Sequence, residues 1–104
     1  AFSDLEILAD LKVEAGGEGE NGMKAVACVV MNRVNITYGE YAGLKDNKGN
    51  YLSTGNLTAS AKPYGEIIIW QNIYNMRPDQ EHYDIANWAI AGNRLTTLLR
   101  AMVF

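Results

Sequence analysis

One apolar stretch, residues 21–36, constrains the fold more than any other part of the sequence. It is longer than an ordinary strand, and a helix that is apolar on all sides is normally buried among other elements. We therefore predict a central buried helix here, with a strand as the alternative because of the valines. The apolar side chains of the stretch are Met23, Ala25, Val26, Ala27, Cys28, Val29, Val30, Met31 and Val34.

Three further helices are predicted, so the expected fold class is mainly α. Ser3 and Glu6 form a capping-box pattern at the start of the first one, and glycines end it. Pro63 suits the first turn of another. The predicted ranges are residues 4–15, 63–70 and 79–91, with Gly92 closing the last.

A long glycine-rich segment, residues 38–61, lies in the middle of the chain. Its Gly, Asn, Asp and Lys content is typical of loops, and residues 47–52 are predicted to form a small β-hairpin. Loops of this length inside a compact domain are usually functional or mobile.

Length and charge limit the classes of protein to consider. The chain has 104 residues and suits one domain, residues 1–104. The net charge of -3 argues against a nucleic acid bound by a broad basic surface. No apolar run is long enough to span a membrane, and the start has no signal-peptide pattern. We expect the domain to continue past Phe104, because the sequence is still apolar there.

The side chains available for chemistry are few. A single histidine, His82, and a single cysteine, Cys28, cannot supply a clustered zinc site, so we expect neither metal nor cofactor. Cys28 lies within the apolar stretch, where a thiol behaves as a small hydrophobe. His82 is predicted to be a surface residue.

Carboxylates are the remaining candidates for catalysis. Glu14 follows Ile7 and Leu11 at helical spacing, which places it on or beside the apolar side of the first predicted helix. A carboxyl group on an apolar surface loses hydration of its charged form, so its pKa rises and it can act as a general acid. The alternative is a solvated surface acid, like others near helix ends.

The order of residues resembles the opening of the SleB-type cell wall hydrolases, the spore cortex-lytic enzymes. The family pattern is Glu-Ala-Arg-Gly-Glu, a short spacer with Gly, Ala-Val-Ala, and a closing Asn-Arg-Val. Gly16 replaces the motif arginine, which removes a cation that could orient a carboxylate or the substrate. The matching segments are Glu14-Ala15-Gly16-Gly17-Glu18, Gly22, Lys24-Ala25-Val26-Ala27 and Val29-Val30-Met31-Asn32-Arg33-Val34.

The resemblance implies a lysozyme-like helical domain that acts on peptidoglycan glycan strands outside the cytoplasm, at a cell wall or spore cortex or in a phage particle. The implied activity is that of a lytic transglycosylase, which cleaves the bond from N-acetylmuramic acid to N-acetylglucosamine and leaves 1,6-anhydro ends. Glu14 matches the catalytic glutamate. Glu18 matches the second motif acid, either a structural residue or a helper. The resemblance does not indicate an oligomeric state.

Aromatic side chains are expected to line the sugar cleft, because sugar C–H faces pack on flat rings. Trp88, in contrast, is predicted to be a core residue. Asn32 and Arg33 are predicted to hold the Glu14 region by hydrogen bonds. The substrate-binding candidates are Tyr38, Tyr41, Tyr51, Trp70 and Tyr74, together with Gln71, which stands where the family has a Gln-Phe-Ser segment.

Three alternatives remain open at this point. A hydrolytic muramidase would cleave the same bond with water. A cell-wall-binding or phage structural module would keep the fold without activity, which the missing motif arginine favours. A helical interaction domain would share the motif by chance.

Overall fold

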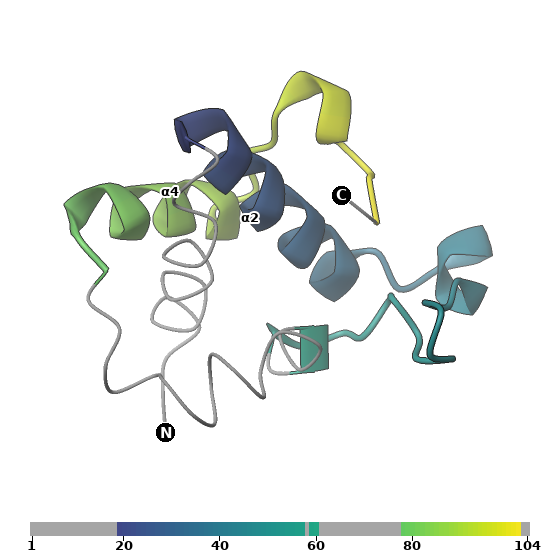
Figure 1. Ribbon diagram of the computed structural model, residues 1–104. Coiled ribbons are helices and arrows are strands. Elements are labelled where there is room, and N and C mark those ends of the chain that lie inside the picture. The colour runs from purple at the N-terminus through teal and green to yellow at the C-terminus, as the bar shows by residue number, and fades with distance from the viewer. Residues whose placement is uncertain (1–18, 58, 61–77, 103–104) are drawn as a thin grey trace.

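The computed structural model describes residues 19–57, 59–60 and 78–102, and this part of the chain is mainly helical (Figure 1). The predicted helices over residues 4–15 and 63–70 lie outside the described residues. In the described part of the chain, no helix is long and apolar enough to cross a membrane. The elements are α2 (Gly19–Asn35), the short 3-10 helix η2 (Gly39–Gly43), α4 (Gln80–Ile90) and the 3-10 helix η4 (Thr96–Leu98).

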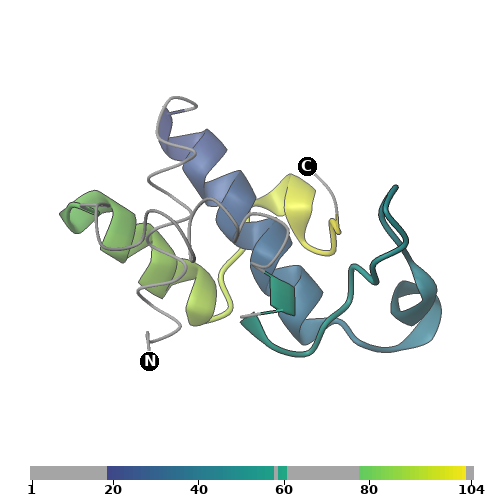
Figure 2. The same cartoon turned by 60° about the horizontal axis from the view of Figure 1, so that its bottom comes forward.

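The apolar stretch forms α2, so the helix prediction is confirmed and the strand alternative is wrong. The helix is buried because other segments cover several of its sides. One side packs against α4, a second meets the C-terminal segment, residues 95–102, and its last turn is joined to the loop that follows. Figure 2 shows α2 running between α4 and η4. Because other segments cover α2 on several sides, residues 21–36 need no continuous polar face.

The amphipathic helix predicted over residues 79–91 is α4. The backbone N–H of Asp79 donates to Nδ1 of His82 at 3.0 Å, so the histidine caps the helix start. His82 is partly buried, whereas the sequence predicted a surface residue. Gly92 ends the helix with a φ of 102°, a conformation that glycine adopts without strain.

The core lies between α2 and α4. Met23, Ala27 and Val30 follow the helical repeat along one side of α2, and they meet Ile85 and Ala89 of α4. Small residues on both helices let the backbones approach closely. The other buried members of this cluster are Met31, Leu57 and Ala86, and the half-buried Val26, Val34, Tyr83 and Trp88 pack against it.

Polar side chains of α2 bind the C-terminal segment. The Asn32 amide nitrogen donates to the carbonyl oxygens of Leu98 at 2.9 Å and Ala101 at 3.0 Å. Nε of Arg33 donates to the Met102 carbonyl at 2.7 Å. Asn32 and Arg33 thus hold the C-terminal segment by hydrogen bonds. Their predicted contact with the Glu14 region lies outside the described residues.

The loop after α2 contains η2 and one antiparallel bridge, between Lys45 and Tyr51. No strand forms among the described residues, so the small hairpin predicted over 47–52 is reduced to this single bridge around a tight turn. Ser53 and Thr54 attach the loop to the end of α2, through the carbonyl groups of Ile36 and Arg33.

Replacing the buried Asn32 by Ala should lower the free energy of unfolding by about 2–4 kcal/mol, because it leaves two part-buried carbonyl groups without a donor. Urea unfolding followed by circular dichroism measures the change. Asn35→Ala, at the exposed end of α2, is the matched control and should have little effect. Equal destabilisation by the two substitutions would contradict the role assigned to the Asn32 amide.

Candidate functional site

Five of the eight predicted site residues lie outside the described residues: Glu14, Glu18, Trp70, Gln71 and Tyr74. The other three lie in the loop after α2, and two of them, Tyr38 and Tyr51, are exposed. Their exposed fractions are 63% and 57%, so both rings are available to a ligand. The third tyrosine of this loop, Tyr41, instead packs on a small core cluster formed by Ile36, Leu52 and Met102.

The ring of Tyr51 is positioned by the bridge to Lys45. The Lys45 ammonium lies 4.8 Å from the centre of the Tyr51 ring, a cation–π contact at the surface. A tight turn between the two residues sets this pairing. In that turn, Asp46 Oδ1 accepts backbone hydrogen bonds from Lys48 and Asn50, each at 2.9 Å.

The backbone hydrogen bond from Asn50 is the largest cause that lowers the pKa of Asp46 below its ordinary value of 3.8. The bonds favour the ionised carboxylate, which accepts them more strongly than the neutral acid does. A group with a lowered pKa stabilises the turn above its ordinary pKa, and this contribution is lost as the pH falls through the lowered value.

The turn should therefore keep its hydrogen bonds at neutral pH and lose them in acid. Nuclear magnetic resonance of the Lys48 and Asn50 amide groups should show a transition with a midpoint below 3.8. Asp46→Ala should abolish this transition. A midpoint at or above the ordinary aspartate value would contradict the assigned hydrogen bonds.

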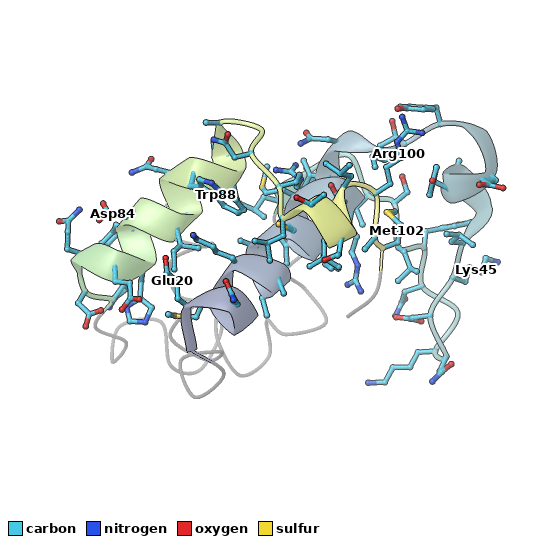
Figure 3. The ribbon with its side chains drawn as sticks, turned by 90° about the horizontal axis from the view of Figure 1, so that it is seen from above. Glu20, Lys45, Asp84, Trp88, Arg100 and Met102 are labelled. Atoms are coloured by element: carbon cyan, nitrogen blue, oxygen red, sulfur yellow. The ribbon has the colours of Figure 1, made fainter. Side chains whose placement is uncertain are left out.

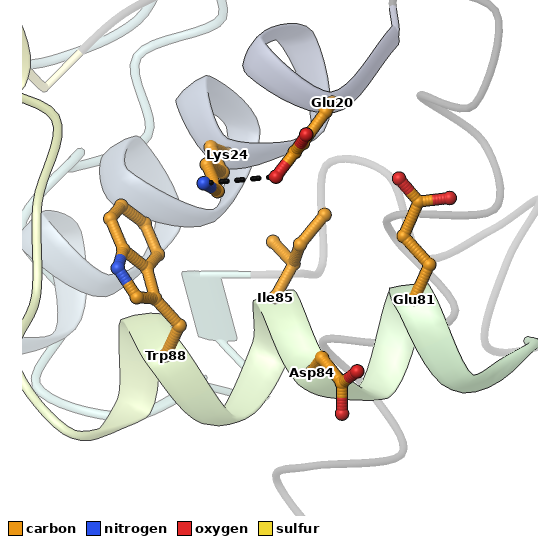
Figure 4. A pocket seen from close by; sticks show the side chains of 6 residues that line it. All are labelled: Glu20, Lys24, Glu81, Asp84, Ile85 and Trp88. Carbon is orange, nitrogen blue, oxygen red and sulfur yellow. Dashed lines mark ion pairs between the residues drawn. The ribbon is translucent and has the colours of Figure 1, made fainter.

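An open pocket with a volume of approximately 370 Å³ lies between α2 and α4 (Figure 4). Its apolar wall consists of Ile85 and the half-buried Trp88, whose side chain also packs on the core. The polar groups come from both helices. Glu20 and Lys24 of α2 and Glu81 and Asp84 of α4 complete the lining.

Lys24 connects the polar and aromatic parts of the pocket. Its ammonium lies 3.1 Å from Glu20 Oε1 and 5.3 Å from the centre of the Trp88 ring. The Lys24 side chain is 25% exposed and that of Glu20 is 62% exposed. The ammonium therefore sits above the indole while solvent still reaches the carboxylate that it pairs with.

The carboxylates of the pocket differ in their surroundings. In Figure 4, Glu20 points from α2 toward Lys24 and Glu81 points from α4 toward α2, whereas Asp84 points away from α2. Asp84 accepts a hydrogen bond from Gln80 at 2.8 Å. No cluster of three or more potential metal ligands occurs within the described ranges. The arrangement offers hydrogen-bond acceptors, one ammonium donor and an aromatic wall.

Lys24, Glu81 and Asp84 were not predicted as site residues, and Trp88 was predicted to be a core residue. A signal was present, because residues 81, 84, 85 and 88 recur at the spacing of one face of a helix. That face combines two acids with a tryptophan and an isoleucine. Such a mixed face is unusual for a surface directed only to solvent, but its partner on α2 could not be identified from spacing.

The two exposed tyrosines and the pocket lie in different parts of the molecule. Lys45, which contacts Tyr51, appears at one end in Figure 3, and Glu20, Asp84 and Trp88 gather at the other. Figures 1 and 2 likewise place η2 far from α4. The structure thus does not bring Tyr38 or Tyr51 to the pocket wall formed by Trp88.

Comparison with family models, with curated proteins and with solved structures gave no match for this chain.

Lys24→Met should change the free energy of unfolding by less than about 1 kcal/mol, because partly exposed ion pairs contribute little. Trp88→Ala should cost about 2–3 kcal/mol, since it removes apolar area that packs on the core. Urea unfolding of both variants tests this difference. A large loss of stability in Lys24→Met would mean that the ammonium is a structural element of the α2–α4 contact.

Proposed function

We propose that this protein is a peptidoglycan lytic transglycosylase that cleaves the bond between N-acetylmuramic acid and N-acetylglucosamine, with Glu14 as its catalytic acid and base. The observation that carries the proposal is the ordered motif from Glu14 to Val34, which resembles the SleB-type cell wall hydrolases. The reaction needs neither a metal nor a cofactor.

A single carboxyl group is sufficient for this reaction. Glu14 donates its proton to the glycosidic oxygen while the bond from that oxygen to C1 of the muramic acid breaks. The 6-hydroxyl oxygen of the same sugar then bonds to C1, and the Glu14 carboxylate takes the hydroxyl proton. The acid is regenerated without water, whereas ordinary glycosidases need a second carboxylate to activate water or attack the sugar.

The described part of the motif supports the proposal through its position. Residues 19–34 of the motif lie on α2, and the closing Asn32 and Arg33 are buried and bonded to the C-terminal segment. Glu18 directly precedes Gly19, the first residue of α2. The motif acids therefore stand in sequence next to the end of α2 that carries Glu20 and the pocket.

The mainly helical described part is compatible with a lysozyme-like arrangement, which we include in the proposal. The substrate is the glycan strand, and the site of action is extracytoplasmic or in a phage particle. Tyr38, Tyr51, Trp70, Gln71 and Tyr74 are the proposed substrate contacts, with Glu18 as a helper or a structural acid.

Glu14→Gln should reduce the release of fragments from purified cell walls by about 100-fold to 10,000-fold, the usual contribution of general acid–base catalysis. Turbidity of the wall suspension measures the rate, and mass spectrometry of the fragments should show 1,6-anhydro-muramic ends. Glu40→Gln, which removes an exposed carboxylate in η2, is the matched control and should retain the wild-type rate.

The outcome separates the remaining alternatives. Reducing muramic ends without anhydro rings would identify a hydrolytic muramidase. Walls that bind the protein and stay intact would identify a binding or phage structural module, and Glu14→Gln would then change nothing. Fragment release that persists in Glu14→Gln would contradict the assigned catalytic residue.

A further inference from the structure

The pocket between α2 and α4 combines the features that bind one sugar ring. Sugar-binding sites pair an aromatic face, which packs on ring C–H groups, with polar groups that bind hydroxyl and acetamido groups. Here Trp88 provides the indole, Lys24 a donor, and Glu20 and Glu81 the acceptors. The volume of approximately 370 Å³ is at the lower end of the range for small ligands.

The position of Lys24 favours a neutral ligand over a cation. Its ammonium already lies over the Trp88 ring, where a cationic ligand would bind, and it already pairs with Glu20. A second ammonium would meet repulsion from Lys24 at short range. An anion would meet the carboxylates of Glu20 and Glu81. A neutral ligand with both donors and acceptors fits these charges without either conflict.

We propose that the α2–α4 pocket is a saccharide subsite that binds an N-acetylated sugar ring on Trp88, with Lys24 donating to the acetamido oxygen and Glu81 accepting from a hydroxyl. The sugar takes the indole face over which the ammonium now lies, and the ammonium turns toward the acetamido oxygen. This inference rests on the proposed function for its ligand class, since the glycan strand carries an acetamido group on its sugars. It adds a binding position on α4, which the motif does not include.

The two side chains should have different effects on specificity. Trp88 contacts the ring through its C–H groups, which all pyranoses share, whereas Lys24 contacts the acetamido group. Trp88→Leu should therefore weaken the binding of every oligosaccharide. Lys24→Met keeps the alkyl stem and removes the donor, so it should weaken the binding of acetamido sugars and leave other sugars unaffected.

Titration of the Glu14→Gln protein with chitotetraose and with maltotetraose tests this assignment, because neither ligand is cleaved by that variant. The Trp88 indole N–H should shift in the nuclear magnetic resonance spectrum with chitotetraose. Lys24→Met should weaken chitotetraose binding about tenfold, equal to the loss of one modest hydrogen bond to a charged group. The preference of the protein for chitotetraose over maltotetraose should fall by the same factor. Trp88→Leu should weaken both ligands, and Glu40→Gln should weaken neither.

Folding of each variant is checked by its thermal unfolding, and the Trp88 signal of the Glu14→Gln protein gives a result that needs no pocket substitution. An unmoved Trp88 signal would overturn the subsite, and cell-wall cleavage by the wild-type chain would then leave the proposed function standing. Binding at Trp88 by a chain that cleaves no walls would support the subsite and overturn the catalytic assignment. A larger Trp88 shift with the diamine cadaverine than with chitotetraose would show a cation site and overturn the proposal.

Discussion

The amide side chain of Asn32 is the point at which three parts of the described structure meet. Its nitrogen binds two carbonyl groups of the C-terminal segment, and its oxygen accepts a hydrogen bond from Nε of Arg94 at 2.8 Å. Arg94 also donates to the carbonyl of Ala89 at the end of α4. Because an amide is both donor and acceptor, one buried side chain joins α2, the end of α4 and the C-terminal segment.

This junction carries a desolvation cost that its hydrogen bonds offset. Burial lowers the pKa of Arg94, and a buried polar group is tolerated only where its bonds are made. The guanidinium has carbonyl and amide oxygens as acceptors, from Ala89, Asn93 and Asn32. Apolar packing alone could slide along α2, whereas these bonds fix the C-terminal segment at one register.

The two longest described elements could be predicted from the sequence, and the contacts between distant segments could not. The all-round apolar character of residues 21–36 predicted α2, and the periodicity before Gly92 predicted α4, because local spacing reports which sides of a helix are covered. Spacing does not report the partner. The bonds of Asn32 to residues 98 and 101 span more than sixty positions, so spacing could not identify these acceptors.

The same limit applies to the candidate site. Trp88 was interpreted as core, and it does pack there, but its remaining surface forms a pocket wall because α2 places Lys24 above it. The pocket needs one helix for its aromatic wall and another for its donor. The exposure of Tyr38 and Tyr51 fits the prediction of accessible rings in the loop, although neither lines the pocket between α2 and α4.

The thiol of Cys28 is fully buried, and its sulfur accepts a hydrogen bond from the backbone N–H of Leu95 at 3.3 Å. A reagent can reach this sulfur only when the structure around it opens, since the thiol is covered in the closed state. The chain has no second cysteine to react, so the rate of thiol alkylation measures how often this opening occurs. The hydrogen bond from Leu95 links that opening to the contact between α2 and the C-terminal segment.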